Sequence, residues 1–394
     1  MAAEATPKPI RETTHPPLLL NPNKRYPLLK TATHHPHPEP TLPISQTKHH
    51  HPPPTPSPKT TTKQPPTPDS PEEEGSVYFI GNATTILSYA SLRFLTDPNF
   101  LHAGDHVHLG PGVTSQRLRD PIVPGLGSLP PVDCVLLSHY HEDHFDREVE
   151  ANLNRDVPIV TTPHARGCLT EQKGEGEGFR RVLGVGAFEG VLVKPVGEDD
   201  ERERGDGGSG GGGKEAVRVT GMPGKHVPPG PLGVANELLG AVPPTNGWLV
   251  ELGWTKPAGS AATSGGSGGE GEEGEEFETG YRIYISGDTL FVDELREIPK
   301  RLRGDRIDLM LAHLGGTTIP GPHMPLLMVT MDGRQGVQLM RLVDPDVMVP
   351  IHFDDYDVML SSLDDFKKEV AAAGLEDRVV YLDRGEEFGF AVKK

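Results

Sequence analysis

Short runs of apolar residues recur along residues 76–394 and alternate with turns that carry glycine, proline or charged residues. Apolar runs of about four to eight residues between such turns are typical of strands. Val132–Leu137 is a continuous apolar run, which suits a strand that is buried on both faces. The expected strands are Val77–Ile80, Thr85–Ser88, Leu92–Thr96, Val132–Leu137, Pro158–Thr162, Val191–Pro195, Ala216–Thr220, Trp248–Leu252, Arg282–Ser286, Ile307–Ala312 and Val347–Ile351.

Three longer segments are helix candidates: Val292–Leu302, Gly333–Val343 and Leu363–Ala373. The last strands, Ile307–Ala312 and Val347–Ile351, fall between these helices, so the second half of the chain alternates strand and helix. Strands and helices in this order predict a layered α/β fold with the helices on the outside.

Residues 1–75 differ from the rest of the chain in composition. They hold 19 of the 41 prolines and 7 of the 18 histidines, and no strand or helix period extends over a useful length. Because proline removes amide donors and fixes φ, this segment is predicted to be a disordered tail. Its histidine clusters, such as His49–His51, are explained by low-complexity composition better than by metal binding.

Two glycine-rich acidic segments interrupt the rest of the chain. Residues 197–216 carry a net charge of −4 and residues 257–280 a net charge of −6. Both are nearly free of apolar residues, so we expect flexible surface insertions between strands. Long insertions cost little, because the entropy of loop closure grows only logarithmically with length. Residues 76–394 are therefore predicted to form one large domain that carries two insertions.

Composition excludes several classes of protein. The formal net charge of −18 disfavours a nucleic-acid partner, since phosphate backbones bind clustered Lys and Arg. No apolar run approaches the roughly 18–20 residues that cross a bilayer. The N-terminus lacks the apolar core of a signal peptide, and two cysteines are too few for a disulfide scaffold. These features favour a reducing, cytoplasmic location without a transmembrane segment.

One segment concentrates chemistry at the end of the most continuous apolar run. There the sequence passes into His-x-His-x-Asp-His, formed by His139, His141, Asp143 and His144. The period of two along a strand lets His139 and His141 point the same way, while Asp143 and His144 turn toward a second point. Imidazole and carboxylate groups are the ligands that borderline divalent metals favour. A metal site explains this spacing better than a solvated polar loop does.

Three later strands each end at one more candidate ligand. His226 follows a strand and a Gly/Pro turn, Asp288 follows Gly287 after an apolar strand, and His352 follows Pro350-Ile351. Positions just beyond buried strands are where open α/β folds place their sites. We therefore expect these three side chains to join the first four.

This set of motifs resembles the metallo-β-lactamase superfamily over most of residues 76–394. The resemblance implies a four-layer αββα sandwich, with Asp97 as an early structural aspartate. It assigns His139, His141 and His226 to a first metal and Asp143, His144 and His352 to a second, with Asp288 as the bridge. The Pro-x-x-His and Pro-Ile-His forms resemble the branch that contains ascorbate-phosphate lactonase and N-acylphosphatidylethanolamine phospholipase D.

The resemblance implies a metal-dependent hydrolase that uses a metal-bound hydroxide in a dinuclear site. Zinc is the expected ion, two per chain, although manganese or iron also suit such ligands. A small-molecule or lipid-like substrate with an ester, lactone or phosphodiester bond is expected, and the residues do not choose among these bonds. Asp143 is placed to orient the hydroxide and accept its proton. The alternative is a regulatory protein of the same fold that binds metal without catalysis.

Other histidines are weaker candidates. His313 ends an apolar strand and is either a catalytic proton donor or a structural residue. His164 follows Pro163 at an expected helix start, which favours a structural or cleft-rim role over ligation. His323 lies in a Gly/Pro loop. The Met-rich run Met324–Met331 is interpreted as ordinary core, with an adaptable pocket lining as the alternative.

Overall fold

The computed structural model describes residues 10, 13–30, 61–63, 75–171, 174, 176–196, 214–240, 242–257 and 275–393. Two sheets dominate this part of the chain. The first runs in the order β1 (Leu18–Leu20), β11 (Gly190–Pro195), β12 (Lys214–Pro223), β13 (Asn246–Pro257), β14 (Glu275–Ile285), β15 (Leu309–His313) and β18 (Val347–Ile351). The second runs in the order β10 (Val182–Gly184), β9 (Ile159–Thr161), β8 (Cys134–Leu136), β5 (Leu92–Thr96), β4 (Thr84–Tyr89), β3 (Gly75–Gly81), β19 (Glu386–Phe390) and β2 (Thr61–Lys63).

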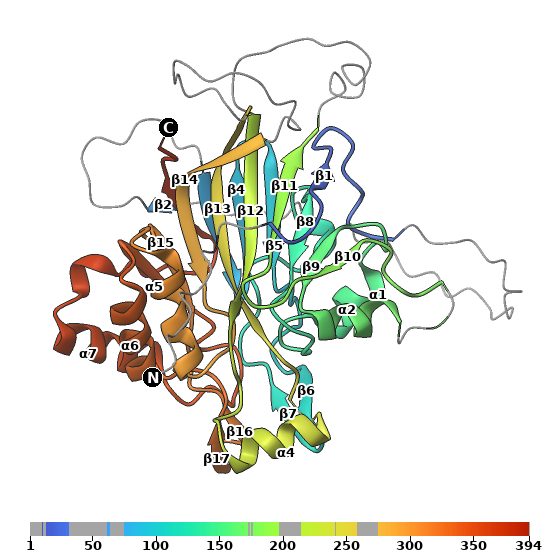
Figure 1. Ribbon diagram of the computed structural model, residues 1–394. Helices are drawn as coiled ribbons and strands as arrows, with labels where there is room; N and C mark the ends of the chain where they lie inside the picture. The colour runs from blue at the N-terminus through green and yellow to red at the C-terminus, as the bar shows by residue number, and fades with distance from the viewer. Residues whose placement is uncertain are drawn as a thin grey trace, which may run out of the picture.

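Helices cover the outer faces of both sheets (Figure 1). The first sheet is covered by α5 (Glu297–Leu302), α6 (Gly333–Val343) and α7 (Leu363–Ala373), and the second by α1 (Arg147–Asn152) and α2 (Pro163–Thr170). One buried cluster, with Phe94 and Val250 among its members, fills the space between the sheets. Separate clusters lie under the two helical layers. The predicted four-layer αββα sandwich is therefore confirmed.

Local sequence signals explain why the last two helices lie where the pattern predicts them. The Asp332 side chain accepts a hydrogen bond from Gln335 N and caps the start of α6. Ser362 and Asp365 form a capping box at the start of α7, which ends at Gly374 in the left-handed conformation. Both helices have the bounds expected from the sequence.

Part of the predicted tail belongs to the domain. Strand β1 pairs in parallel with β11, and Leu20 is buried between the sheets. Arg25 donates to Asp133 with an Nε–Oδ1 distance of 2.9 Å. The prediction of a disordered tail is therefore wrong for residues 13–30, where three consecutive leucines are enough to add an edge strand. Strand β2 also pairs with β19, and residues 1–9, 11–12, 31–60 and 64–74 lie outside the described residues.

The insertions are shorter than the composition suggests. Strand β12 begins at Lys214 and β14 begins at Glu275, inside the segments expected to be loops. The paired strands continue through polar residues because ladder hydrogen bonds do not depend on side-chain polarity. Residues 197–213 and 258–274 lie outside the part of the chain that the structure describes.

Three elements near the site were not expected from the sequence, and they gather at one end of the molecule (Figure 1). They are the hairpin β6 (His106–Gly110) with β7 (Val113–Gln116), the helix α4 (Pro231–Leu239), and the hairpin β16 (Thr318–Gly321) with β17 (Met324–Met328). Met324 and Leu326 are 55% and 73% exposed, whereas Val329 and Met331 are buried. The prediction that Met324–Met331 is core is therefore wrong for the hairpin and holds only where the chain re-enters the domain.

Candidate metal centre

The structure brings all seven predicted ligands to one edge of the two sheets. The loop after β8 carries His139, His141, Asp143 and His144, and the ends of β12, β14 and β18 lead to the other three. Strands β14, β15 and β18 are parallel, so their carboxyl ends meet at the same edge. The seven residues form two neighbouring groups.

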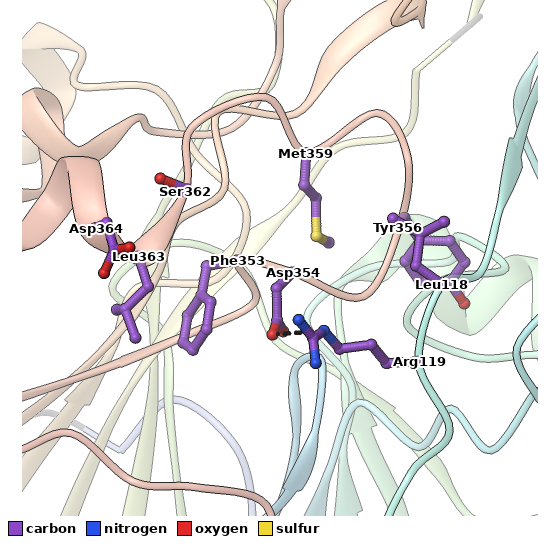
Figure 2. Close-up of a pocket in the computed structure, with 9 residues that line it drawn as sticks. All are labelled: Leu118, Arg119, Phe353, Asp354, Tyr356, Met359, Ser362, Leu363 and Asp364. Atoms are coloured by element: carbon purple, nitrogen blue, oxygen red, sulfur yellow. Dashed lines mark ion pairs between the residues drawn. The ribbon is translucent and has the colours of Figure 1, made fainter.

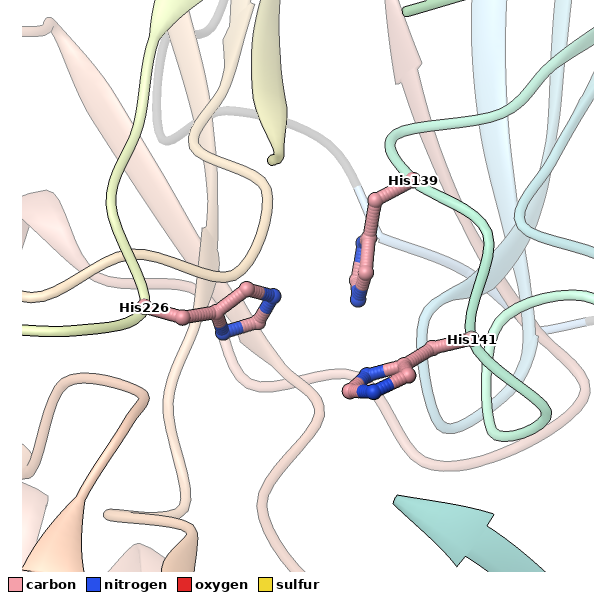
Figure 3. Close-up of side chains that lie close together, drawn as sticks. All are labelled: His139, His141 and His226. Atoms are coloured by element: carbon pink, nitrogen blue, oxygen red, sulfur yellow. The ribbon is translucent and has the colours of Figure 1, made fainter. Parts of the chain in front are cut away.

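The first group consists of three histidines. One ligand atom from each of His139, His141 and His226 lies within 4.8 Å of the other two. Figure 3 shows the three rings converging from two separate segments of the chain. His139 and His226 are buried, and His141 is half-buried. This arrangement suits one metal ion with three imidazole ligands.

The second group contains two carboxylates and two histidines. His144 Nε2 lies 3.3 Å from Asp288 Oδ2 and 3.6 Å from Asp143 Oδ2. His352 Nε2 lies 3.6 Å from the same oxygen of each carboxylate. All four side chains are buried, so the group has the imidazole and carboxylate donors that divalent metals favour.

Unpartnered polar atoms test whether these residues fit a metal. The Nε2 atoms of His139, His141, His144, His226 and His352 are buried without a hydrogen-bond partner among the described residues. Asp143 Oδ1 is also buried without a hydrogen-bond partner among these residues. An unsatisfied buried polar group is costly, so native proteins keep only a few of them. Six such atoms facing one another fit a site for metal ions.

Hydrogen bonds to the opposite ring nitrogens orient two of these histidines. His226 Nδ1 donates to Val329 O at 3.1 Å, and His352 Nδ1 donates to Leu314 O at 3.2 Å. With the proton fixed on Nδ1, each Nε2 presents a lone pair to the site. His352 also has a left-handed backbone with φ of 58°, a strained conformation of the kind that occurs at functional sites.

Asp97 holds the loop that follows β8 through hydrogen bonds. Its carboxylate accepts hydrogen bonds from Ser138 N at 2.7 Å and from Ser138 Oγ at 2.9 Å. His144 Nδ1 lies 3.1 Å from Asp97 Oδ2. This buried aspartate therefore fixes both the start of the loop and one ring of the second group, which is consistent with the structural role implied by the resemblance.

The two groups differ in their electrostatics. Burial lowers the pKa of His139 well below its usual value, and burial also lowers the pKa of His141 to about 4. In the second group burial is outweighed by Asp288 and Asp143, which raise the pKa of His144. The first group therefore holds neutral imidazoles, whereas the second holds imidazolium paired with carboxylate in the absence of a metal.

His313 lies next to the second group. Its Nδ1 is 2.9 Å from Asp288 Oδ1, and its Nε2 has no hydrogen-bond partner among the described residues. Thr330 Oγ1 donates to the other oxygen of Asp288 at 2.9 Å. His313 thus contacts the proposed bridging carboxylate directly. His323 is exposed on the turn between β16 and β17, and His164 is exposed on α2.

A buried polar network supports the second group and was missed by sequence reasoning. Asn82 Nδ2 donates to Asp143 O at 2.6 Å, and Asn82 O accepts from His352 N at 2.9 Å. Asp355 Oδ2 accepts from Asn82 N at 2.7 Å, and its Oδ1 pairs with Arg117 Nη2 at 3.0 Å. The residues of this network are distant in sequence, so no local spacing predicts their contacts.

Two pockets of about 560 Å³ flank this end of the molecule. One lies beyond the His352 loop, where Arg119 is paired with Asp354 (Figure 2). The other includes His226, Lys225 and His164 in its lining. The predicted cleft-rim position of His164 agrees with this placement.

Relatives of the chain are named as metal-dependent hydrolases. The chain is 24% identical over 288 residues to a UPF0173 metal-dependent hydrolase of Cupriavidus metallidurans. The match spans 73% of the chain and 79% of the relative. A relative of the same name from Thermodesulfovibrio yellowstonii is 19% identical over 266 residues, or 66% of the chain and 76% of that relative. No protein-family model matches the chain.

Solved structures share the fold. An isothiocyanate hydrolase from Delia radicum gut bacteria gives a TM-score of 0.55 at 18% identity, covering 81% of this chain and 100% of that one. A possible metal-dependent hydrolase from Veillonella parvula gives 0.54 at 19% identity, covering 80% and 99%. At these identities the likeness shows a shared fold and nothing about activity.

The αββα layers and the ordered ligand motifs give the chain a metallo-β-lactamase-type fold, and its relatives are named as metal-dependent hydrolases. The narrower branch suggested by Pro223 and Pro350 stays a prediction. Among the described residues, no helix has the length and apolarity that a bilayer span requires.

Proposed function

We propose that this protein is a metal-dependent hydrolase whose two side-chain groups hold two divalent ions, with zinc as the expected metal. The observation that carries the proposal is the convergence of buried, unpartnered imidazole nitrogens on two neighbouring points. Manganese and iron also accept such donors. The names of the relatives support hydrolysis as the reaction.

Bound ions would polarise a carbonyl or phosphoryl oxygen and make a water molecule acidic enough to attack at neutral pH. Asp143 Oδ1 has no hydrogen-bond partner among the described residues and lies 3.8 Å from His141 Nδ1 of the first group, so it is placed to orient this water and accept its proton. The water oxygen forms a bond to carbon or phosphorus, the bond to the leaving oxygen breaks, and the proton passes to that oxygen. Asp288 is held by His313 and Thr330, which keeps it fixed between the groups.

Metal analysis combined with a substrate panel tests this proposal. The purified protein should contain about two transition-metal ions per chain and hydrolyse at least one of a 4-nitrophenyl ester, a lactone and bis(4-nitrophenyl) phosphate. His139→Ala and His352→Ala should each lose one ion and nearly all turnover. Two bound ions without turnover of any substrate would instead favour the non-catalytic metal-binding alternative.

A further inference from the structure

The pocket beside the first histidine group adjoins the candidate centre. It is built by residues after β12, by α4 and by residues 242–245. A narrow cleft lies over the metal ligands and has His141, Asp143 and Asp288 in its lining. The pocket and this cleft share His226 and Val242. The two spaces are therefore neighbours, and the pocket is placed to receive the rest of a molecule that reacts at the ligands.

The cleft over the ligands is too small to hold a whole substrate. The cleft over the ligands has a volume of about 10 Å³, which is room for about one water molecule. The adjoining pocket has about 560 Å³, within the range of small-molecule sites. A reacting group fits in the cleft only if the rest of its molecule lies in the larger space.

The side chains that line the pocket are mostly small and uncharged, although polar atoms supply nearly half of its surface. Valine, proline and glycine make up most of the lining residues, including Val227, Pro229, Val234, Val242, Pro243 and Pro244. Lys225 forms an exposed ion pair with Glu294. The amide of Asn236 is used by the backbone of Val242, with which it makes two hydrogen bonds. The pocket therefore offers apolar side chains together with uncharged polar surface, and little to bind a charge.

We propose that this pocket receives the uncharged apolar part of a carboxylic ester or similar carbonyl compound, so that the protein acts on neutral carbonyl substrates. This inference rests on the proposed hydrolase function. A phosphodiester carries a charge that is normally recognised by Arg or Lys. The basic residues that line the two flanking pockets, Lys225 and Arg119, are both paired with carboxylates.

The first test compares two 4-nitrophenyl esters that differ only in acyl length. Each buried methylene contributes roughly a threefold to fourfold gain in kcat/KM, so the hexanoate should exceed the acetate by at least tenfold. Val234→Asp, at a position that is 58% exposed on α4, should lower kcat/KM for the hexanoate more than for the acetate and so remove most of this preference. Leu118→Asp, in the other pocket and 52% exposed, is the matched control and should keep it.

The second test concerns charge. Glu294→Gln releases Lys225, so it should raise kcat/KM for the 4-nitrophenyl monoester of adipic acid, which has a free carboxylate, by about threefold to tenfold. Glu297→Gln is the matched control, because it makes the same charge change beside Lys300 on α5. Equal effects of the two variants, or no gain from Glu294→Gln, would count against the proposal that the substrate occupies this pocket.

The outcomes separate this inference from the proposed function. Hydrolysis of bis(4-nitrophenyl) phosphate in preference to both esters would overturn the pocket assignment and leave the hydrolase proposal standing. If no substrate turns over, the hydrolase proposal fails. Binding of hexanamide, measured by NMR titration, then decides whether the pocket accepts an uncharged apolar group. Binding that is lost in Val234→Asp and retained in Leu118→Asp supports it, and absence of binding overturns it.

Discussion

His313 Nδ1 lies 2.9 Å from Asp288 Oδ1, and both side chains are buried. Because Thr330 donates to the other oxygen, the carboxylate of Asp288 cannot rotate without losing a hydrogen bond. An aspartate between two metal positions needs a fixed orientation to serve both. We infer that His313 positions Asp288, in the way that neighbouring residues orient metal ligands in other sites.

Substitution of His313 separates this positioning role from proton donation. His313→Ala should weaken metal binding by about 10–100-fold, while His313→Asn retains a donor near Nδ1 and should restore much of the affinity. A proton donor would behave differently, because both variants would lower kcat with metal content intact. Metal titration alongside kcat distinguishes the roles. Asp288→Ala should be more damaging than either variant, since it removes a ligand rather than its support.

Removal of the metal should destabilise the domain. Chelation leaves the buried Nε2 atoms of His139, His141 and His226 without partners among the described residues, and each such atom costs roughly 1–3 kcal/mol. Thermal unfolding of chelated protein should therefore occur at a markedly lower temperature, and added zinc should restore it. An unchanged unfolding temperature in protein shown to have lost its metal would mean that these residues are not ligands.

The ligands could be predicted from the sequence because each stands at the end of an apolar strand. The run before His139 fixes the strand, and the period of two then fixes which side chains point together. Asn82 and Asp355 gave no such signal, since their contacts with Asp143 and Arg117 depend on the packing of distant segments. Leu326 was misassigned because apolar composition does not reveal which side of an exposed hairpin lacks a neighbour.

The edge strand β1 gives a direct test of the corrected N-terminal boundary. Leu20→Ala should reduce the free energy of unfolding by about 2 kcal/mol, because it leaves a space among residues packed between the sheets. Leu19→Ala is the matched control, since Leu19 is 39% exposed and should change stability little. Equal, negligible effects in denaturant unfolding would show that β1 does not contribute to the domain.

Cys134 should be unreactive in the native protein. Burial raises the pKa of its thiol to about 12 from a usual value of 9.0. At pH 8 the thiolate fraction is then about a thousandfold lower than for an ordinary cysteine. As the pH rises above 9 the unfolded chain ionises first, so this group lowers stability only in alkaline solution. Alkylation at pH 8 followed by peptide mass analysis should find Cys134 modified only after denaturation.

The buried pair of Arg117 and Asp355 provides a further test of how the second ligand group is supported. Both side chains are almost fully buried, with Nη2 and Oδ1 3.0 Å apart. Asp355 also accepts from Asn82 N, and Asn82 contacts the backbone of Asp143 and His352. Loss of the guanidinium would leave a buried carboxylate with one fewer partner and loosen the residue that connects two ligands.

Arg117→Met should therefore lower the free energy of unfolding by about 3 kcal/mol, since breaking a buried ion pair costs more than replacing it. It should also weaken the binding of one of the two metal ions. Lys367→Met removes an exposed partner of Asp364 and is the matched control, with little expected change in either quantity. Adding Asp355→Leu to Arg117→Met should not recover the stability, because it also removes the acceptor of Asn82 N and a partner of Arg384, and metal affinity should stay low. Recovery of metal affinity in the double variant would show that the network stabilises the fold without positioning the ligands.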